Sequence, residues 1–140
     1  MGFLIRFFNE GIKFTLKNKP GIRKWLEDVI REENKNLSYI NIIFCSDEVL
    51  LVLNKNYLDH ETLTDILTFP YQENDKMVSG DIFISIDRVR ENATEFGQDF
   101  EKEVKRVMVH GVLHLIGYSD HRKKEKVIMT DREDYYLALF

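Results

Sequence analysis

Cysteine and uninterrupted apolar stretches are scarce in this sequence, and their scarcity excludes several classes of protein. Cys45 is the single cysteine among 140 residues, so no disulfide can form within the chain. It lies in an apolar run, where we expect a small buried hydrophobic residue in a reducing compartment. The N-terminal segment 1–16 is interrupted by Arg6, Glu10 and Lys13 and has no cleavage-site pattern. We therefore predict a cytoplasmic protein without a signal peptide or membrane anchor.

An excess of basic residues is also missing. The formal net charge is −4, which argues against a protein that coats nucleic acid through a general positive field. Any contact with a polyanion must therefore be local. The candidate RNA-binding residues are Arg88, Arg90 and Arg122. Further basic residues lie ahead of the histidines and directly after them: Lys102, Lys105, Arg106, Lys123 and Lys124. Each of these side chains could equally lie on a solvated helix face.

The length and composition predict one domain that spans residues 1–140, and the order of the expected elements makes it an α+β domain. Hydrophobic residues make up 44% of the chain, which is enough to bury a core. The hydrophobic periodicity predicts about five helices and a small mixed sheet of four or five strands. The expected strands are 3–8, 12–16, 39–45, 65–69 and 81–86; the expected helices begin at Pro20 and Asp47 and lie near 88–96, 100–116 and 123–138, with a polar loop at 59–62.

Three of the four histidines lie within twelve residues, and their spacing indicates a metal site. His110 and His114 are four residues apart, so a helix would place both imidazoles on one face. Gly117 can end that helix in a left-handed conformation, and the chain can then return His121 to the same point. Three neutral nitrogens with an open fourth position are typical of a catalytic zinc site. The site should lie at the end of a buried helix, because the residues around the histidines are mostly apolar.

The residue after the first histidine limits the chemistry. In the H-E-x-x-H metalloproteases it is a glutamate that serves as general base, whereas here it is Gly111. Peptide hydrolysis by that route is therefore disfavoured. Gly111 could leave open space beside the metal for a bulky group such as a phosphodiester, or it could pack against a neighbouring strand.

The stretch from His110 to His121 resembles the H-G-x-L-H-L-x-G-Y-D-H signature of the YbeY family, which comprises bacterial zinc-dependent endoribonucleases and ribosomal RNA maturation factors. Other segments resemble family blocks in the same order, and together they cover roughly residues 39–138. These segments are Leu53 to Tyr57, Thr64 to Pro70, Gly80 to Ile84, and Met129 with Glu133 to Leu137.

Two positions depart from the family pattern. Ser119 is an extra residue between Tyr118 and Asp120, which a loop can absorb. Leu58 stands where the family usually has an arginine that is implicated in nuclease activity. An aliphatic side chain cannot hold a phosphate, so this charge would have to come from Arg88, Arg90 or Arg122.

The resemblance implies an endoribonuclease specific for single-stranded RNA that acts in ribosome maturation at the 3′ end of small-subunit 16S ribosomal RNA. One zinc ion would be held by His110, His114 and His121. Asp81 and Asp120 are the motif carboxylates that could orient a histidine or accept a proton during catalysis. The partners implied are ribosomal RNA and the small ribosomal subunit. Two alternatives remain open: a non-catalytic ribosome assembly factor with a structural zinc, which Leu58 favours, and a zinc hydrolase of a small molecule.

Overall fold

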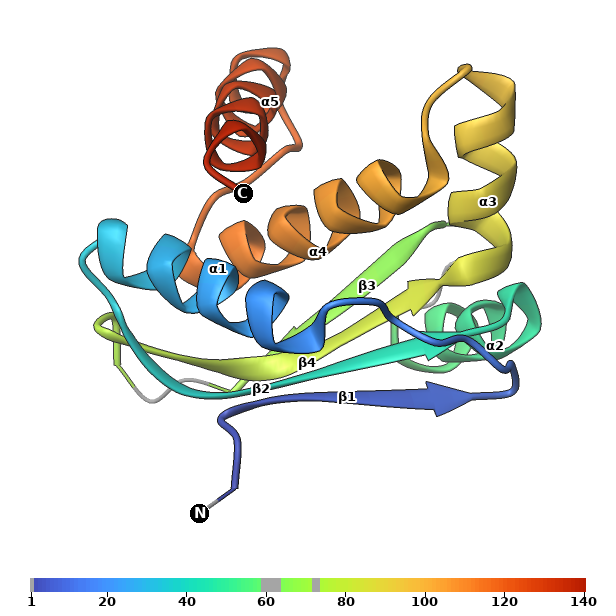
Figure 1. Cartoon of the computed structure of the whole chain (residues 1–140), viewed down its shortest axis with the longest axis horizontal. Coiled ribbons are helices and arrows are strands. Elements are labelled where there is room, and N and C mark those ends of the chain that lie inside the picture. The colour runs from blue at the N-terminus through green and yellow to red at the C-terminus, as the bar shows by residue number, and fades with distance from the viewer. Residues whose placement is uncertain (1, 59–63, 72–73) are drawn as a thin grey trace.

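The chain folds into a four-stranded mixed sheet with helices on both faces (Figure 1). The computed structural model describes residues 2–58, 64–71 and 74–140. The predicted loop at 59–62, which includes His60, therefore lies outside the described residues. In chain order the elements are β1 (Ile5–Glu10), α1 (Lys19–Glu32), β2 (Asn36–Cys45), α2 (Asp47–Leu58), β3 (Ile66–Pro70), β4 (Met77–Ser85), α3 (Ile86–Glu95), α4 (Phe100–Ile116) and α5 (Lys123–Ala138).

The sheet order is β1-β2-β4-β3, with β3 as the antiparallel edge. The expected neighbours 65–69 and 81–86 do pair, with Leu67 opposite Phe83. The predicted strand at 12–16 is wrong, because β1 pairs in parallel with β2 and the chain must first cross over through α1. Its apolar residues are explained by packing: Leu16 is buried, and Ile12 and Phe14 pack against the core.

Local signals account for the helix boundaries. Pro20 lies in the first turn of α1, where its missing N–H leaves no bond unmade. The Ser46 hydroxyl accepts a hydrogen bond from the Val49 amide and so caps the start of α2, where the sequence predicts that a helix begins. Helix α4 begins after Asp99, whose carboxylate caps the Lys102 amide, and it ends at Gly117 with φ at 128°. Only glycine adopts that backbone conformation without strain, and it redirects the chain toward His121.

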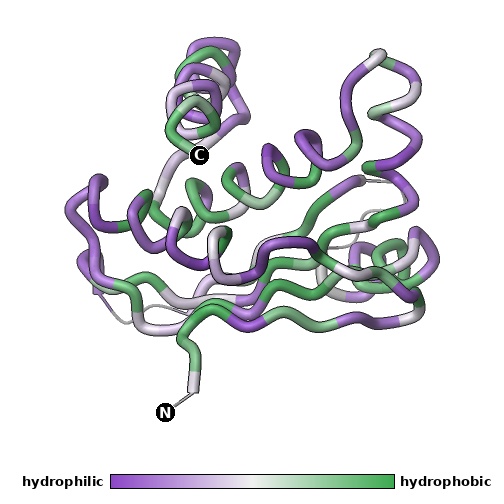
Figure 2. Tube along the Cα trace, in the orientation of Figure 1, coloured by the Kyte–Doolittle hydropathy of each residue, from purple (hydrophilic) through white to green (hydrophobic). Residues whose placement is uncertain are grey.

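Most of the core lies between the sheet and helices α1 and α4, which cover the same face (Figure 1). Figure 2 shows hydrophobic residues concentrated along the strands and on parts of α4. A smaller cluster of Cys45, Leu50 and Leu67 lies beneath α2 on the opposite face. Helix α5 packs on the outer side of α4. Among the described residues, no helix is both long and apolar enough to cross a bilayer.

Gly111 lies where α4 meets the sheet, and its role is packing. A Cβ added there would approach Ile66 Cδ1 and Ile82 Cγ2 to 2.9 Å each. The idea that this glycine leaves open space beside the metal is therefore wrong, and the alternative of contact with a neighbouring strand is confirmed. Close contact at Gly111 brings the histidine-bearing part of α4 down onto β3 and β4.

Candidate metal centre

Helix α4 places His110 and His114 one turn apart, and their rings meet beside a cavity that His110 lines. The two Nε2 atoms are 3.0 Å apart. Asp120, in the turn after the helix, places its Oδ2 atom 3.4 Å from each of them. These three residues form a group whose ligand atoms could hold one metal ion. All three side chains are partly buried.

The histidine tautomers follow from the hydrogen bonds on the other ring nitrogen. His110 Nδ1 donates to the Glu133 carboxylate at 2.5 Å, and His114 Nδ1 donates to the Tyr118 backbone carbonyl at 2.9 Å. When both rings are neutral, as metal binding requires, both Nε2 atoms carry a lone pair, and both lone pairs face the Asp120 carboxylate. Three acceptors that converge in this way repel one another unless a cation lies between them.

The separations also suit a metal ion. Nitrogen and oxygen donors at about 2.05 Å from zinc in a tetrahedral arrangement are about 3.3 Å from each other. The edges of the triangle formed by His110, His114 and Asp120 are 3.0, 3.4 and 3.4 Å. The residues present therefore fit a tetrahedral ion that keeps at least one position for another ligand.

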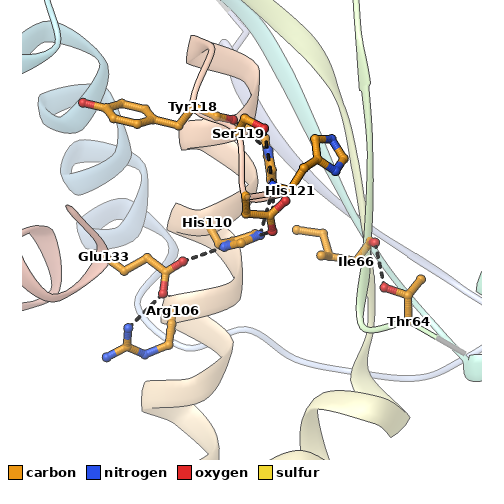
Figure 3. A network of polar contacts seen from close by, with 10 residues as sticks. Thr64, Ile66, Arg106, His110, Tyr118, Ser119, His121 and Glu133 are labelled. Atoms are coloured by element: carbon orange, nitrogen blue, oxygen red, sulfur yellow. Dashed lines mark hydrogen bonds and ion pairs between the residues drawn. The ribbon is translucent and has the colours of Figure 1, made fainter. Parts of the chain in front are cut away.

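Glu133, on α5, links His110 to a cation. Its two carboxylate oxygens accept hydrogen bonds from His110 Nδ1 and from Arg106 Nη1, the latter at 2.9 Å (Figure 3). Burial alone lowers the pKa of His110, but the bond to Glu133 and the charges of Glu133, Asp120 and Asp65 outweigh it and raise that pKa. Such a carboxylate fixes the ring of a ligand histidine and makes it more basic.

His114 has a different environment. Burial and the neighbouring His110 lower its pKa, and its Nδ1 partner is an uncharged carbonyl. It therefore favours the neutral form that a metal ligand requires.

A cavity of about 370 Å³ adjoins this centre, between α4, α5 and the start of β3. Asp65 lines it, and burial raises the pKa of this carboxyl group. Carboxylates outnumber cations along the wall: the acidic residues are Asp65, Glu103, Asp120 and Glu133, and the basic ones are Arg106 and Lys126. A divalent cation would offset this negative charge.

The predicted site residues do not all meet. His121 lies outside the metal-ligating group, and Figure 3 shows its ring turned away from His110. Asp120, expected to play a catalytic role, instead provides the third converging atom.

Asp81 is on β4, where successive side chains point to alternate faces of the sheet. Ile82 contacts α4, so Asp81 points to the opposite face. There it accepts a hydrogen bond from Asn41 Nδ2 at 3.0 Å.

The candidate arginines lie in two places. Arg88 forms ion pairs with Asp47 and Glu91, and Arg90 lies over the Phe100 ring. Neither lines the cavity beside the histidines. Arg122 is exposed at the start of α5, directly after His121.

Sequence reasoning missed Glu133 and gave Asp65 no site role. The signal for Glu133 was available, because it falls at helical spacing between Met129 and Tyr136, and all three are buried. A charged residue within an apolar stripe requires a partner. Asp65 gave no such signal, since only the fold brings the start of β3 beside α4.

Comparisons with known proteins agree with this geometry. The family model described as "Endoribonuclease YbeY" matches residues 6–140. The chain belongs to the YbeY endoribonuclease family. A relative in Flavobacterium psychrophilum named "Endoribonuclease YbeY" is 47% identical over 133 residues, which cover 95% of this chain and 94% of the relative. One of the same name in Bacteroides thetaiotaomicron is 41% identical over 135 residues, covering 96% and 98%.

The fold is also similar to a solved structure. The solution structure of TM1509 from Thermotoga maritima superposes with a TM-score of 0.67 at 33% identity. The match covers 95% of this chain and 86% of that one. The resemblance to the YbeY family is thus confirmed over nearly the whole chain.

Proposed function

We propose that this protein is a zinc-dependent endoribonuclease that cleaves single-stranded RNA during maturation of the 3′ end of small-subunit 16S ribosomal RNA. The observation that carries the proposal is the convergence of two imidazole nitrogens and a carboxylate beside a cavity, in a chain of an endoribonuclease family. Its substrate partners would be ribosomal RNA and the small ribosomal subunit.

In this proposal one zinc ion is held by His110 and His114 with His121 as the third ligand. Asp120 and His121 are consecutive in the turn that follows α4, so this proposal requires the turn to present His121 to the ion where Asp120 now lies. When bound, zinc acidifies a water molecule or polarises a phosphate oxygen. Glu133 keeps His110 oriented, and Asp120 is the carboxylate placed to accept a proton.

The basic residues proposed to hold the RNA backbone divide by position. Arg122 follows His121 directly and is exposed, which suits contact with a phosphate near the metal. Arg106 and Lys126 line the cavity, although Arg106 is already paired with Glu133 and Asp134. Arg88 and Arg90 belong to another surface hollow, so their proposed role is in binding RNA farther from the cut.

The first test is metal content and RNA cleavage in the purified wild type, His114→Ala and His60→Ala. His60 is the one histidine outside the clustered stretch and serves as the matched control. We expect about one zinc per chain and cleavage of single-stranded RNA in the wild type and in His60→Ala, with both lost in His114→Ala. Cleavage that persists in His114→Ala without bound metal would refute the proposal.

A second test addresses the third ligand. His121→Ala is expected to reduce zinc affinity more than Asp120→Asn does, because nitrogen donors suit zinc and the carboxylate is assigned to proton transfer. If Asp120→Asn has the larger effect, the ligand set is His110, His114 and Asp120.

One specific observation favours a different function, a non-catalytic ribosome assembly factor with a structural zinc. Leu58 replaces the arginine that the family resemblance associates with cleavage. The variant Leu58→Arg separates the two functions. A catalytic protein with a reduced rate should cleave RNA faster after the exchange. An assembly factor should co-sediment with small subunits and leave RNA intact in both forms.

A further inference from the structure

A second acidic residue, Glu33 at the end of α1, is connected to the metal centre through Tyr118. The Tyr118 hydroxyl donates to Glu33 Oε1 at 2.7 Å. The backbone carbonyl of the same Tyr118 accepts the hydrogen bond from His114 Nδ1. Figure 3 shows the Tyr118 ring extended away from His110. One residue thus joins the histidine to a helix far away in sequence.

Glu33 is itself held firmly. Its side chain is 11% exposed, and its other carboxylate oxygen accepts hydrogen bonds from the Tyr136 hydroxyl and from Arg132 Nη1, both on α5. Three donors around one nearly buried carboxylate fix its position better than a single surface contact does. Tyr136 is buried, and its backbone carbonyl accepts a bond from the Trp25 indole on α1.

The contact between Tyr118 and Glu33 restrains the turn that follows α4, because of where Tyr118 lies in the chain. Tyr118 lies between Gly117, which ends α4, and the turn that holds Asp120 and His121. With φ at 128°, Gly117 provides no side chain to restrict this turn, and a Cβ there would meet no atom within 4 Å. The Tyr118 ring is therefore the side-chain anchor that connects the start of the turn to the body of the protein.

We infer that Glu33 is a positioning residue of the metal centre, which acts through Tyr118 to orient His114 and the ligand turn 118–121. The Glu133 carboxylate orients His110 directly. His114 is oriented by the backbone carbonyl of Tyr118, and the Tyr118 side chain is in turn held by Glu33. The two histidines thus receive support from different carboxylates: His110 from Glu133 on α5, and His114, through Tyr118, from Glu33 at the end of α1. This inference rests on the proposed metal site.

The test compares two single-atom deletions at the same carboxylate. Tyr118→Phe removes the hydroxyl that connects Glu33 to the turn, and Tyr136→Phe removes another hydroxyl on Glu33, one that belongs to α5 and not to the turn. Outer partners of metal ligands typically contribute about 10–100-fold in metal affinity, and one bond farther out we expect about tenfold in Tyr118→Phe. Zinc affinity is measured by competition with a chelator, and amide hydrogen exchange is measured at residues 119–121 in the metal-free protein.

Positioning predicts weaker zinc binding and faster exchange of the turn in Tyr118→Phe, with both near wild type in Tyr136→Phe. Glu33→Gln, which keeps an oxygen acceptor, should retain more affinity than Glu33→Ala. Equal zinc affinity in both tyrosine variants, or loss of thermal stability without a change in zinc affinity, would overturn the inference. A wild type that binds no zinc would instead refute the proposed function, so the two failures can be told apart.

Discussion

Replacement of Gly111 by alanine tests how the histidine helix is seated on the sheet. The added Cβ would lie 2.9 Å from Ile66 Cδ1, 2.9 Å from Ile82 Cγ2 and 3.1 Å from Ile82 Cδ1. The side chains of Ile66 and Ile82 must therefore shift, or α4 must lift from the sheet. Overpacking of this kind costs about 1–3 kcal/mol, while the change from glycine to alanine within a helix gains about 1 kcal/mol. Since three contacts are too short, we expect a net loss of about 1–2 kcal/mol.

Thermal or urea unfolding measures this loss. For a chain of this size, about 1 kcal/mol corresponds to about 4 °C in Tm, so a decrease of about 4–8 °C is expected. Ile66→Val removes one of the colliding methyl groups and by itself costs about 0.5–1.5 kcal/mol. The double variant should lose less stability than the sum of the losses in the two single variants, because the smaller valine side chain makes room for the new methyl group.

Helix propensity alone makes the opposite prediction. If Gly111→Ala has the same or greater free energy of unfolding than the wild type, the close approach of α4 to the strands does not limit this position. Full additivity with Ile66→Val would also contradict the steric argument.

Two further predictions concern Glu133 and Cys45. Glu133→Gln should weaken zinc binding by about 10–100-fold, because the neutral amide holds His110 less firmly; Asp134→Asn, which removes the other partner of Arg106, should leave it unchanged in the same chelator competition. Burial, with smaller effects from nearby carboxylates, raises the pKa of Cys45 from 9.0 to about 12, so its thiol should not react with a disulfide reagent at pH 8 until the protein unfolds. Because the pKa of this thiol is higher in the folded than in the unfolded protein, the free energy of unfolding should fall as the pH rises from 9 toward 12. The Cys45→Ala variant should lack this part of the fall. Rapid labelling of the native protein would contradict the burial of the thiol.

The sequence by itself predicted the five helices and all four strands, together with one strand, at 12–16, that does not exist. Amphipathic spacing and end signals such as Pro20, Ser46 and Gly117 are local, so they act before any tertiary contact forms. The same local logic predicted that His110 and His114 share one helical face, because four residues span about one turn. The signature motif added the family, which the comparisons confirmed.

Strand pairing was decided by the tertiary structure. Residues 12–16 have the composition of a strand, yet the hydrogen-bonding partner of β1 is β2, on the far side of α1. Their apolar side chains are buried by packing against the core without a strand partner. Composition reports that a segment is buried, but it does not report which neighbour buries it.

The environment of the metal centre likewise depended on the fold. Glu33, Asp65 and Glu133 come from three elements distant in sequence, and only the packing of α1, β3 and α5 around α4 brings them to the histidines. The face on which Asp81 lies was set by the pairing register of β4, which no single-residue pattern fixes. The sequence therefore determined which side chains could bind a metal, because their spacing along one helix is local. The tertiary structure decided which carboxylates orient them, because those contacts join segments that only folding brings together.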